Sequence, residues 1–94
     1  MHVDKLEKLE IRSFLGCDYE YNWNYWGNDI SLTSNVRSAS ACYNICRSAY
    51  AFSWHTPNHH YQPRGCWCKD ANYRQHEKSE NNVISGEKCD ISSF

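Results

Sequence analysis

The alternation of apolar and polar residues predicts a chain of short β-strands interrupted by one helix. Aromatic side chains occupy every second position from Tyr19 to Tyr25, a spacing that is typical of a strand. The residues 27–29 (Gly-Asn-Asp) then predict a turn, and Ile30 and Leu32 indicate a short extended segment. Further strands are predicted at residues 50–55, 66–69 and 83–86.

One helix is predicted to begin after Ser38, because serine is a common N-cap residue. Four apolar or small residues then recur at positions i, i+3, i+4 and i+7, and these are Cys42, Ile45, Cys46 and Ala49. Residues with this spacing form a single stripe along a helix, which we expect to face the sheet. The two helical cysteines therefore point in the same direction.

A matching pair of cysteines lies on the predicted strand at residues 66–69. Side chains two residues apart on a strand share a face, so Cys66 and Cys68 lie about 6–7 Å apart on one side of the sheet. One helical turn separates the two helical cysteines by about 6 Å. A helix packed on the sheet could therefore form two neighbouring disulfides with this strand, and Cys17 and Cys89 would remain to join the two ends of the chain.

The segments between these elements are polar and predict loops. Residues 56–65 form a loop bracketed by prolines, and residues 70–82 form a polar segment that we expect to be exposed. Residues 1–13 are dense in charge and predict an N-terminal linker or a short helix, which leaves residues 14–94 as one compact domain. The charged start lacks the apolar core of a signal peptide, so we expect a mature or excised domain of a larger, multi-domain protein.

Composition narrows the classes of protein to which this domain can belong. A chain of 94 residues is long enough for one domain, and its 15% of aromatic residues are too many for a disordered protein. No segment approaches the roughly 20 apolar residues of a membrane-spanning helix. A net charge of −1 with scattered Lys and Arg argues against a nucleic-acid partner. Six cysteines in so short and polar a chain favour an oxidised, secreted protein.

Metal binding and catalysis are two alternatives that the same residues raise. Six cysteines and five histidines could ligate zinc, but C-x-C on a strand and C-x-x-x-C on a helix are poor zinc clamps. A thiol nucleophile with His55 or His76 as its base would need a cysteine outside the disulfide framework. Nothing in the sequence brings the carboxylates of Asp29 and Asp70 together. We therefore expect a domain that is not an enzyme and that holds no metal ion or other cofactor.

The order of motifs along the chain carries a family resemblance. The helical C-x-x-x-C pair is followed by Ala51-Phe52-Ser53-Trp54, by Gly65-Cys66-Trp67-Cys68-Lys69 and by a closing Ser85-Gly86. This order covers about residues 14–91 and resembles the PAN/apple domains, most of all those of apicomplexan micronemal adhesins and oomycete lectins. The resemblance implies an α+β fold in which one α-helix packs across a small antiparallel β-sheet.

The resemblance also implies two of the disulfides, Cys42–Cys66 and Cys17–Cys89. The chain departs from the family at Ala49, where the usual partner of the second helical cysteine is missing. It departs again at Cys68, where the family commonly has leucine. We infer that Cys68 replaces the missing partner and pairs with Cys46, and the reversed pairing of the helix and strand cysteines remains an alternative.

Members of this family are extracellular binding modules, so the resemblance implies that the protein recognises another extracellular protein or a cell-surface glycan. A secreted location follows, and storage in a secretory organelle such as a microneme fits it. Five aromatic residues between positions 19 and 26 exceed what one strand can bury, and three of them are candidate protein-docking residues: Trp23, Tyr25 and Trp26. A galactose-type lectin would instead use aromatic and polar side chains from the loop and from the segment after Cys68, and these candidates are Lys69, Tyr73, His59, His60 and Tyr61. We favour the protein partner because the sequence has no diagnostic sugar-binding motif.

Overall fold

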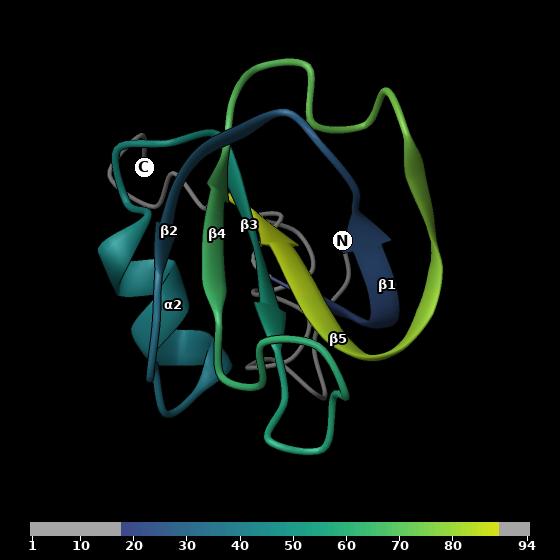
Figure 1. Cartoon of the computed structure of the whole chain (residues 1–94). Coiled ribbons are helices and arrows are strands. Elements are labelled where there is room, and N and C mark those ends of the chain that lie inside the picture. Colours follow the sequence, from purple (N-terminus) through teal and green to yellow (C-terminus); the bar gives the residue numbers. More distant parts are fainter. Residues whose placement is uncertain (1–17, 89–94) are drawn as a thin grey trace, which may run out of the picture.

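The computed structural model describes residues 18–88 of the chain (Figure 1). The predicted boundary between residues 13 and 14 and the predicted Cys17–Cys89 disulfide lie outside the described residues. Within residues 18–88, five strands and one helix follow one another as β1 (Tyr19–Tyr25), β2 (Asp29–Thr33), α2 (Ala39–Ile45), β3 (Ala51–His55), β4 (Cys66–Lys69) and β5 (Glu77–Glu87). The predicted α+β class, a small antiparallel sheet with one helix, is confirmed.

The five strands form one antiparallel sheet in the order β1-β5-β3-β4-β2. The middle strand, β3, pairs on both sides, with Ser53 opposite Trp67 of β4 and Ser85 of β5. All five residues of β3 are buried, because α2 covers one face of the sheet and other parts of the chain cover the opposite face. The strand predicted at residues 66–69 is confirmed as β4, and the strand predicted at residues 50–55 begins one residue later than expected.

The helix α2 begins directly after Ser38, as the sequence predicts. The Oγ atom of Ser38 accepts a hydrogen bond from the backbone N–H of Ala41 at 3.0 Å, which satisfies one of the free amides of the first turn. The prediction that the whole stripe faces the sheet is wrong at Ile45, whose side chain is 46% exposed. The helical cysteines are bonded to β4, so Ile45, which lies at the edge of the stripe, turns toward solvent.

Two disulfides join α2 to β4. Cys42 is bonded to Cys66 and Cys46 to Cys68, with Cα–Cα distances of 5.5 and 5.2 Å that are ordinary for disulfides. These are the pairs inferred from the family resemblance, and the reversed pairing does not occur. The sulfur atoms lie at the centre of the core between helix and sheet, together with Val36, Ala39, Ala49, Phe52 and Trp54. A helix of seven residues has little apolar surface of its own, so these bonds carry much of the link between helix and sheet.

A shared bend carries the end of β1 and the beginning of β5 over the face of the sheet opposite α2. Asn22 and Asn82 have φ values of 58° and 66°, in the left-handed region that asparagine tolerates better than most residues. The backbone N–H of Asn82 donates to Oδ1 of Asn22 at 3.0 Å, so the two bends are hydrogen-bonded to each other. Residues 77–79 of β5 pair with β1 alone, whereas residues 84–86 lie between β1 and β3 and pair with both, and Figure 1 shows β5 curving along this course.

The prediction of an exposed loop over residues 70–82 is wrong in its second half. The strand β5 begins at Glu77 and is 11 residues long. Its first six residues, 77–82, extend past β3, and none of them is fully buried. This half of the strand therefore lacks the apolar alternation by which a strand is recognised in a sequence. Together with the end of β1, it forms one wall of the candidate site.

Replacing Cys46 and Cys68 by alanine tests how much the disulfides stabilise the fold. A bond between residues 22 positions apart removes enough chain entropy from the unfolded state to stabilise the protein by about 3 kcal/mol. We expect the double variant C46A/C68A to lose about this free energy of unfolding in a urea titration under oxidising conditions. The control Ser40→Ala, at an exposed position of the same helix, should change it by less than about 0.5 kcal/mol. A loss in the double variant no larger than in the control would contradict this role of the disulfide.

Candidate functional site

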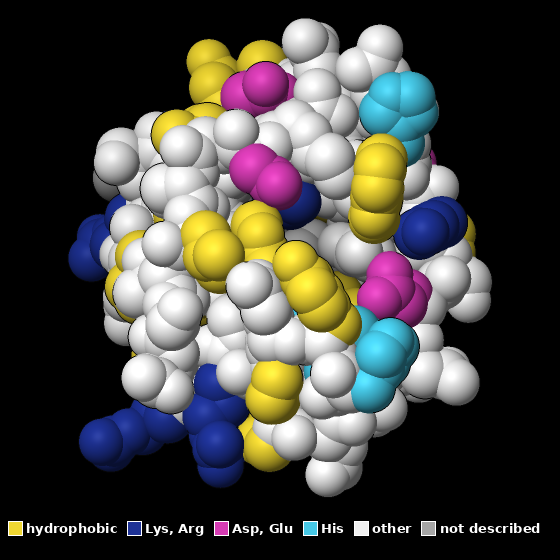
Figure 2. Space-filling view, in the orientation of Figure 1, with side chains coloured by type: hydrophobic (Ala, Val, Ile, Leu, Met, Phe, Trp, Pro, Cys, Tyr) yellow, Lys and Arg dark blue, Asp and Glu magenta, His cyan; other side chains and the backbone are white. Residues whose placement is uncertain are grey.

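A pocket of about 360 Å³ opens on the face of the sheet opposite α2. Strands β3 and β4 form its floor, the bent ends of β1 and β5 form one wall, and the β1–β2 turn and the 56–65 loop complete its rim. The described residues that line it are Asn24, Trp26, Gly27, Asp29, His55, Tyr61, Trp67, Lys69 and Glu80. Figure 2 views the molecule from this side and shows apolar, acidic and histidine side chains gathered around a central hollow.

The alternation of side chains along β4 decides which of them form the floor. Both cysteines of β4 point to the helix, so Trp67 and Lys69 point to the pocket. On the neighbouring strand, the ring of His55 lies 4.3 Å from that of Trp67 between centroids. Trp67 also packs against Gly65, where an added Cβ atom would approach the indole ring to 2.6 Å. The disulfides on one face of the sheet thus fix an aromatic floor on the other face.

Lys69 lies at one end of the floor with its side chain only 3% exposed. Its Nζ donates to the carbonyl oxygen of Gly27 at 3.1 Å and to the carboxylate of Asp29. Burial lowers the pKa of the Lys69 ammonium, and the hydrogen bond to Asp29 opposes that shift. The structure places this predicted ligand contact in the pocket, where its ammonium holds the β1–β2 turn against β4.

Trp26 stands on the rim of the pocket and is 54% exposed. The ammonium of Lys78 lies 5.3 Å from the centroid of the indole ring, and the His76 ring meets it edge-on at 6.4 Å. Gly27 and Asn28 follow with φ values of 78° and 57°, a conformation that glycine and asparagine adopt most readily. The predicted turn is therefore confirmed, and it presents a large aromatic surface at the mouth of the pocket.

His55 and His59 form a stacked pair in the pocket wall. Their rings are nearly parallel, at 11°, and their centroids are 3.7 Å apart. Nδ1 of His55 lies 2.7 Å from the carbonyl oxygen of Tyr61 and so donates to it, whereas Nδ1 of His59 accepts from the backbone N–H of Tyr61 at 3.0 Å. These two bonds fix both tautomers, so the proton of neutral His55 is on Nδ1 and that of neutral His59 is on Nε2.

Glu80 joins this stack to the bent end of β1. Its carboxylate accepts from Nε2 of His59 at 2.7 Å and from Nδ2 of Asn24 at 2.9 Å. Burial raises the pKa of Glu80, but the hydrogen bonds from Asn24 and His59 outweigh this and hold the pKa below its usual value. Glu80 is therefore a carboxylate at neutral pH.

The three side chains His55, His59 and Glu80 raise the question of a metal ion, because their ligand atoms lie within 4.8 Å of one another. The lone pairs of two stacked, parallel imidazoles lie in their ring planes and do not converge on one point. Metal binding at Nε2 of His59 would also move its proton to Nδ1, which faces the N–H of Tyr61. The arrangement therefore suits hydrogen bonding within the wall better than a shared metal ion.

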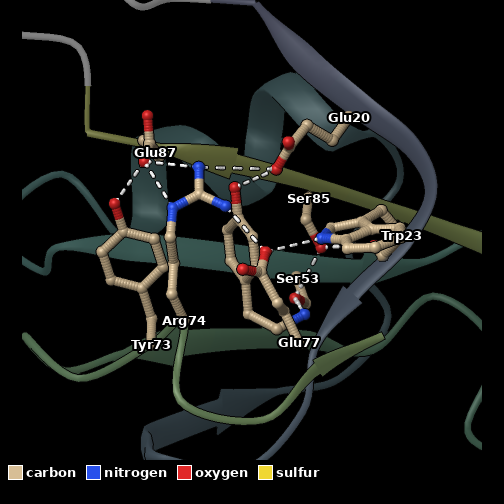
Figure 3. Close-up of polar contacts among 9 residues, drawn as sticks. Glu20, Trp23, Ser53, Tyr73, Arg74, Glu77, Ser85 and Glu87 are labelled. Atoms are coloured by element: carbon tan, nitrogen blue, oxygen red, sulfur yellow. Dashed lines mark hydrogen bonds and ion pairs between the residues drawn. The ribbon is translucent and has the colours of Figure 1, made fainter. Parts of the chain in front are cut away.

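Two buried serines hold the bent end of β1 over the sheet (Figure 3). Oγ of Ser53 lies 2.7 Å from Oγ of Ser85, which donates to the carbonyl oxygen of Trp23 at 2.6 Å. The backbone N–H of Tyr25 donates to Oγ of Ser53 at 3.1 Å. Strand β1 is thus bonded to β3 through side chains, although the two strands are not neighbours in the sheet.

Tyr73 lies away from the pocket, in a polar cluster that braces the outer side of β5 (Figure 3). Its hydroxyl donates to Glu87, and the guanidinium of Arg74 donates to Glu87 and to Glu77, at 2.7 Å in each case. The ring of Tyr73 packs against that of Tyr25, with 4.9 Å between centroids. The structure therefore does not bring this predicted glycan contact together with the others.

Of the other predicted glycan contacts, Tyr61 lines the pocket, whereas His59 and His60 are not among its lining residues. Tyr61 lines the pocket and is 58% exposed. His59 is buried and reaches the pocket through its contacts with His55 and Glu80. His60 is exposed and stacks on His59, with 4.9 Å between ring centroids.

The three predicted docking residues of the aromatic segment differ in how far their side chains are exposed. Tyr25 is 0% exposed, so its assignment to a partner-binding surface is wrong. Its hydroxyl donates to Glu20, and burial, followed by this hydrogen bond, raises the pKa of Tyr25. Trp23 is half-buried and donates its indole N–H to Glu77 at 2.9 Å. Trp26 is the exposed member of the set, and it belongs to the pocket.

Sequence reasoning did not assign six of the lining residues to a binding site: Asn24, Gly27, Asp29, His55, Trp67 and Glu80. Asn24 and Glu80 come from the bent strand ends, whose polar sequence carries no signal of a site. Trp67 and His55 could have been found, because the strand cysteines face the helix and the intervening residue must then face the other side.

Comparison with known proteins leaves the family assignment as a prediction. The chain matches no protein-family model and no curated protein sequence. Among the described residues, none of the helical structure is long and apolar enough to cross a membrane.

The substitution Asp29→Asn tests whether Lys69 depends on its carboxylate partner. It leaves a buried ammonium without its hydrogen-bonded counter-charge, so we expect the free energy of unfolding at pH 7 to fall by about 1–3 kcal/mol in a urea titration. The expected loss is moderate because Asp29 is itself 45% exposed. Asp70→Asn is the comparison and should cost less, since Asp70 acts on Lys69 without a hydrogen bond and accepts from the backbone N–H of Asn72. Equal losses in the two variants would contradict the pairing.

Proposed function

We propose that this domain is a non-catalytic recognition module of an extracellular protein, of PAN/apple type, and that its pocket binds a neutral saccharide. The observation that carries the proposal is the composition of the pocket. An exposed indole stands at its mouth, and side chains that can donate and accept hydrogen bonds line its interior. Sugars have an apolar face that stacks on aromatic rings and hydroxyl groups that both donate and accept.

Several of these polar groups have capacity left for a ligand. Lys69 occupies one carboxylate oxygen of Asp29, and the other has no partner among the described residues. The indole N–H groups of Trp26 and Trp67 likewise have no hydrogen-bond partner within residues 18–88. The pocket can therefore offer both donors and acceptors to a hydroxylated ligand.

The charges of the pocket support a neutral ligand. Asp29 is paired with Lys69, and Glu80 is hydrogen-bonded to His59 and Asn24. Since these charged groups already have partners, an anionic or cationic ligand would have to displace one of them. Burying a charge without a partner is costly, so a neutral polyhydroxylated ligand fits best.

The proposal of an extracellular, non-catalytic role is supported by the same structure. The two disulfides are compatible with a secreted protein, and they leave the four cysteines of the core without a free thiol. Both ring nitrogens of His59 are already hydrogen-bonded, to Tyr61 and to Glu80, and the described cysteines are all in disulfides, so no thiol nucleophile stands beside the Nε2 atom of His55. Asp29 and Asp70 do not share the pocket.

The sequence favours a protein-docking role, whereas the exposure of its aromatic candidates supports our proposal of a glycan. Docking surfaces are anchored by clusters of aromatic residues. Here Tyr25 is buried and Trp23 is half-buried, so Trp26 stands without the other two at the edge of a hollow. Two exposed rings, those of Trp26 and Tyr61, beside a polar pocket suit a small ligand better than a broad protein surface.

A glycan array on the oxidised domain, followed by NMR titration with the neutral saccharide that binds best, tests this function. We expect chemical-shift changes confined to the residues that line the pocket. Trp26→Ala should weaken binding about tenfold, because it removes the stacking surface. Tyr21→Ala is the matched control, since Tyr21 is 66% exposed on β1 outside the pocket and should leave the affinity unchanged. An array without any bound neutral glycan, or equal effects of the two variants, would refute the proposal.

A further inference from the structure

The stacked histidines hold one exposed wall of the pocket in place. His55 and His59 are each only 5% exposed, although histidines are usually at least partly open to water. Between them they hold the backbone of Tyr61, whose carbonyl accepts from His55 and whose N–H donates to His59. The position of Tyr61, and with it part of the pocket rim, therefore depends on the protonation state of two imidazoles.

A second proton on His59 conflicts directly with this arrangement. Nδ1 is the ring nitrogen that is free of a proton in neutral His59, and it accepts from the N–H of Tyr61 at 3.0 Å. A proton at this atom would place two N–H donors against each other. The hydrogen bond would be lost, and the backbone of Tyr61 would have to move.

A second proton on His55 adds to the conflict through the stack. It enters at Nε2, because Nδ1 already carries the proton that is donated to Tyr61. The resulting cation lies against the His59 ring, at a centroid distance of 3.7 Å. Two adjacent positive charges in a buried site repel each other strongly, so the stack is stable when both rings are neutral.

The charged groups around the stack do not compensate for a doubly protonated state. Glu80 of β5 faces both rings and accepts from His59, and His60 of the same loop stacks on His59. Trp67 of β4 packs on His55 without charge. One carboxylate thus faces two imidazoles, and a third imidazole stacks on the second. The carboxylate can balance a single positive charge and leaves a second one without a partner.

We propose that the His55–His59 stack is a pH-sensitive latch on the pocket. The neutral stack holds Tyr61 in place, and its protonation as the pH falls from about 7.5 to 5 displaces Tyr61 and weakens ligand binding. The dependence of ligand binding on pH rests on the proposed function, whereas the displacement of Tyr61 does not. Neutral, stacked rings keep the rim closed around the ligand. Protonated rings release the rim.

The pKa directions agree with this sequence of events. Burial lowers the pKa of His55, the hydrogen bond to Tyr61 opposes that shift, and the neighbouring His59 adds to it. The unfolded chain therefore takes up this proton more readily than the folded protein does. The stabilisation by neutral His55 is complete above about pH 6.5 and is lost as the pH falls below that value. Glu80 has a lowered pKa and stays ionised over the same interval.

NMR on the ¹⁵N-labelled chain without any sugar tests the latch itself. We expect the amide of Tyr61 to shift in one transition between about pH 7 and 5, together with the ring signals of the stack. An amide that stays in place while the histidines titrate would overturn the proposal. So would an amide that moves only below about pH 4.5, with the carboxylates.

A titration with methyl β-galactoside at pH 7.5 and at pH 5.0 then measures the consequence for binding. We expect the affinity to be about tenfold lower at pH 5.0, the size of change that one coupled proton produces over one pH unit. Equal affinities at the two pH values would overturn the coupling. If the galactoside binds at neither pH while the Tyr61 amide moves as expected, the latch stands and it is the proposed galactoside binding that fails.

His59→Asn removes the imidazole and keeps the hydrogen bond, because Oδ1 of asparagine can accept from the N–H of Tyr61. We expect this variant to lose the Tyr61 transition. The matched control His60→Asn, at the exposed neighbouring position, should keep it. Loss of the transition in the control alone would overturn the proposal. If H59N does not fold, the titration of the unsubstituted chain still decides the matter.

Discussion

The two disulfide bonds between α2 and β4 are the constraint on which the rest of the structure depends. They fix the direction of every side chain on β4, because a strand with its cysteines on one face must present the alternate residues on the other. A shift of one residue would place Trp67 and Lys69 against the helix and the sulfur atoms in the pocket. The disulfides therefore stabilise a small core and also determine the floor of the candidate site.

The second constraint is the paired bend at Asn22 and Asn82. Through it, the end of β1 and the beginning of β5 cover part of the sheet face opposite α2. Without it, the ends of β1 and β5 would extend into solvent, and Asn24 and Glu80 could not reach the floor formed by β3 and β4. Two buried serines hold this bend in place through side-chain hydrogen bonds. The pocket side of the molecule is thus held together by side-chain hydrogen bonds, whereas the helical side is held together by disulfides and apolar packing.

The sequence was informative where local spacing determines structure and uninformative where the bend does. The N-cap at Ser38 and the strand at residues 66–69 follow from residue type and spacing alone, and both are present. The sequence predicts a loop for the polar half of β5, because none of its side chains is fully buried and they show no apolar alternation. It predicts a surface position for Tyr25, since no local pattern shows which aromatic residues of a crowded strand the bend will bury. The pocket arises from contacts between residues more than fifty positions apart, such as Asn24 and Glu80.

The most direct test of the account is the disulfide map of the native protein. Non-reducing peptide mapping would have to use fragmentation in the mass spectrometer to separate Cys66 from Cys68, which are two residues apart. The account predicts Cys42 linked to Cys66 and Cys46 linked to Cys68. Free thiols at these four positions, or the reversed pairs, would contradict it, because the register of β4 and the floor of the pocket would then lose their basis.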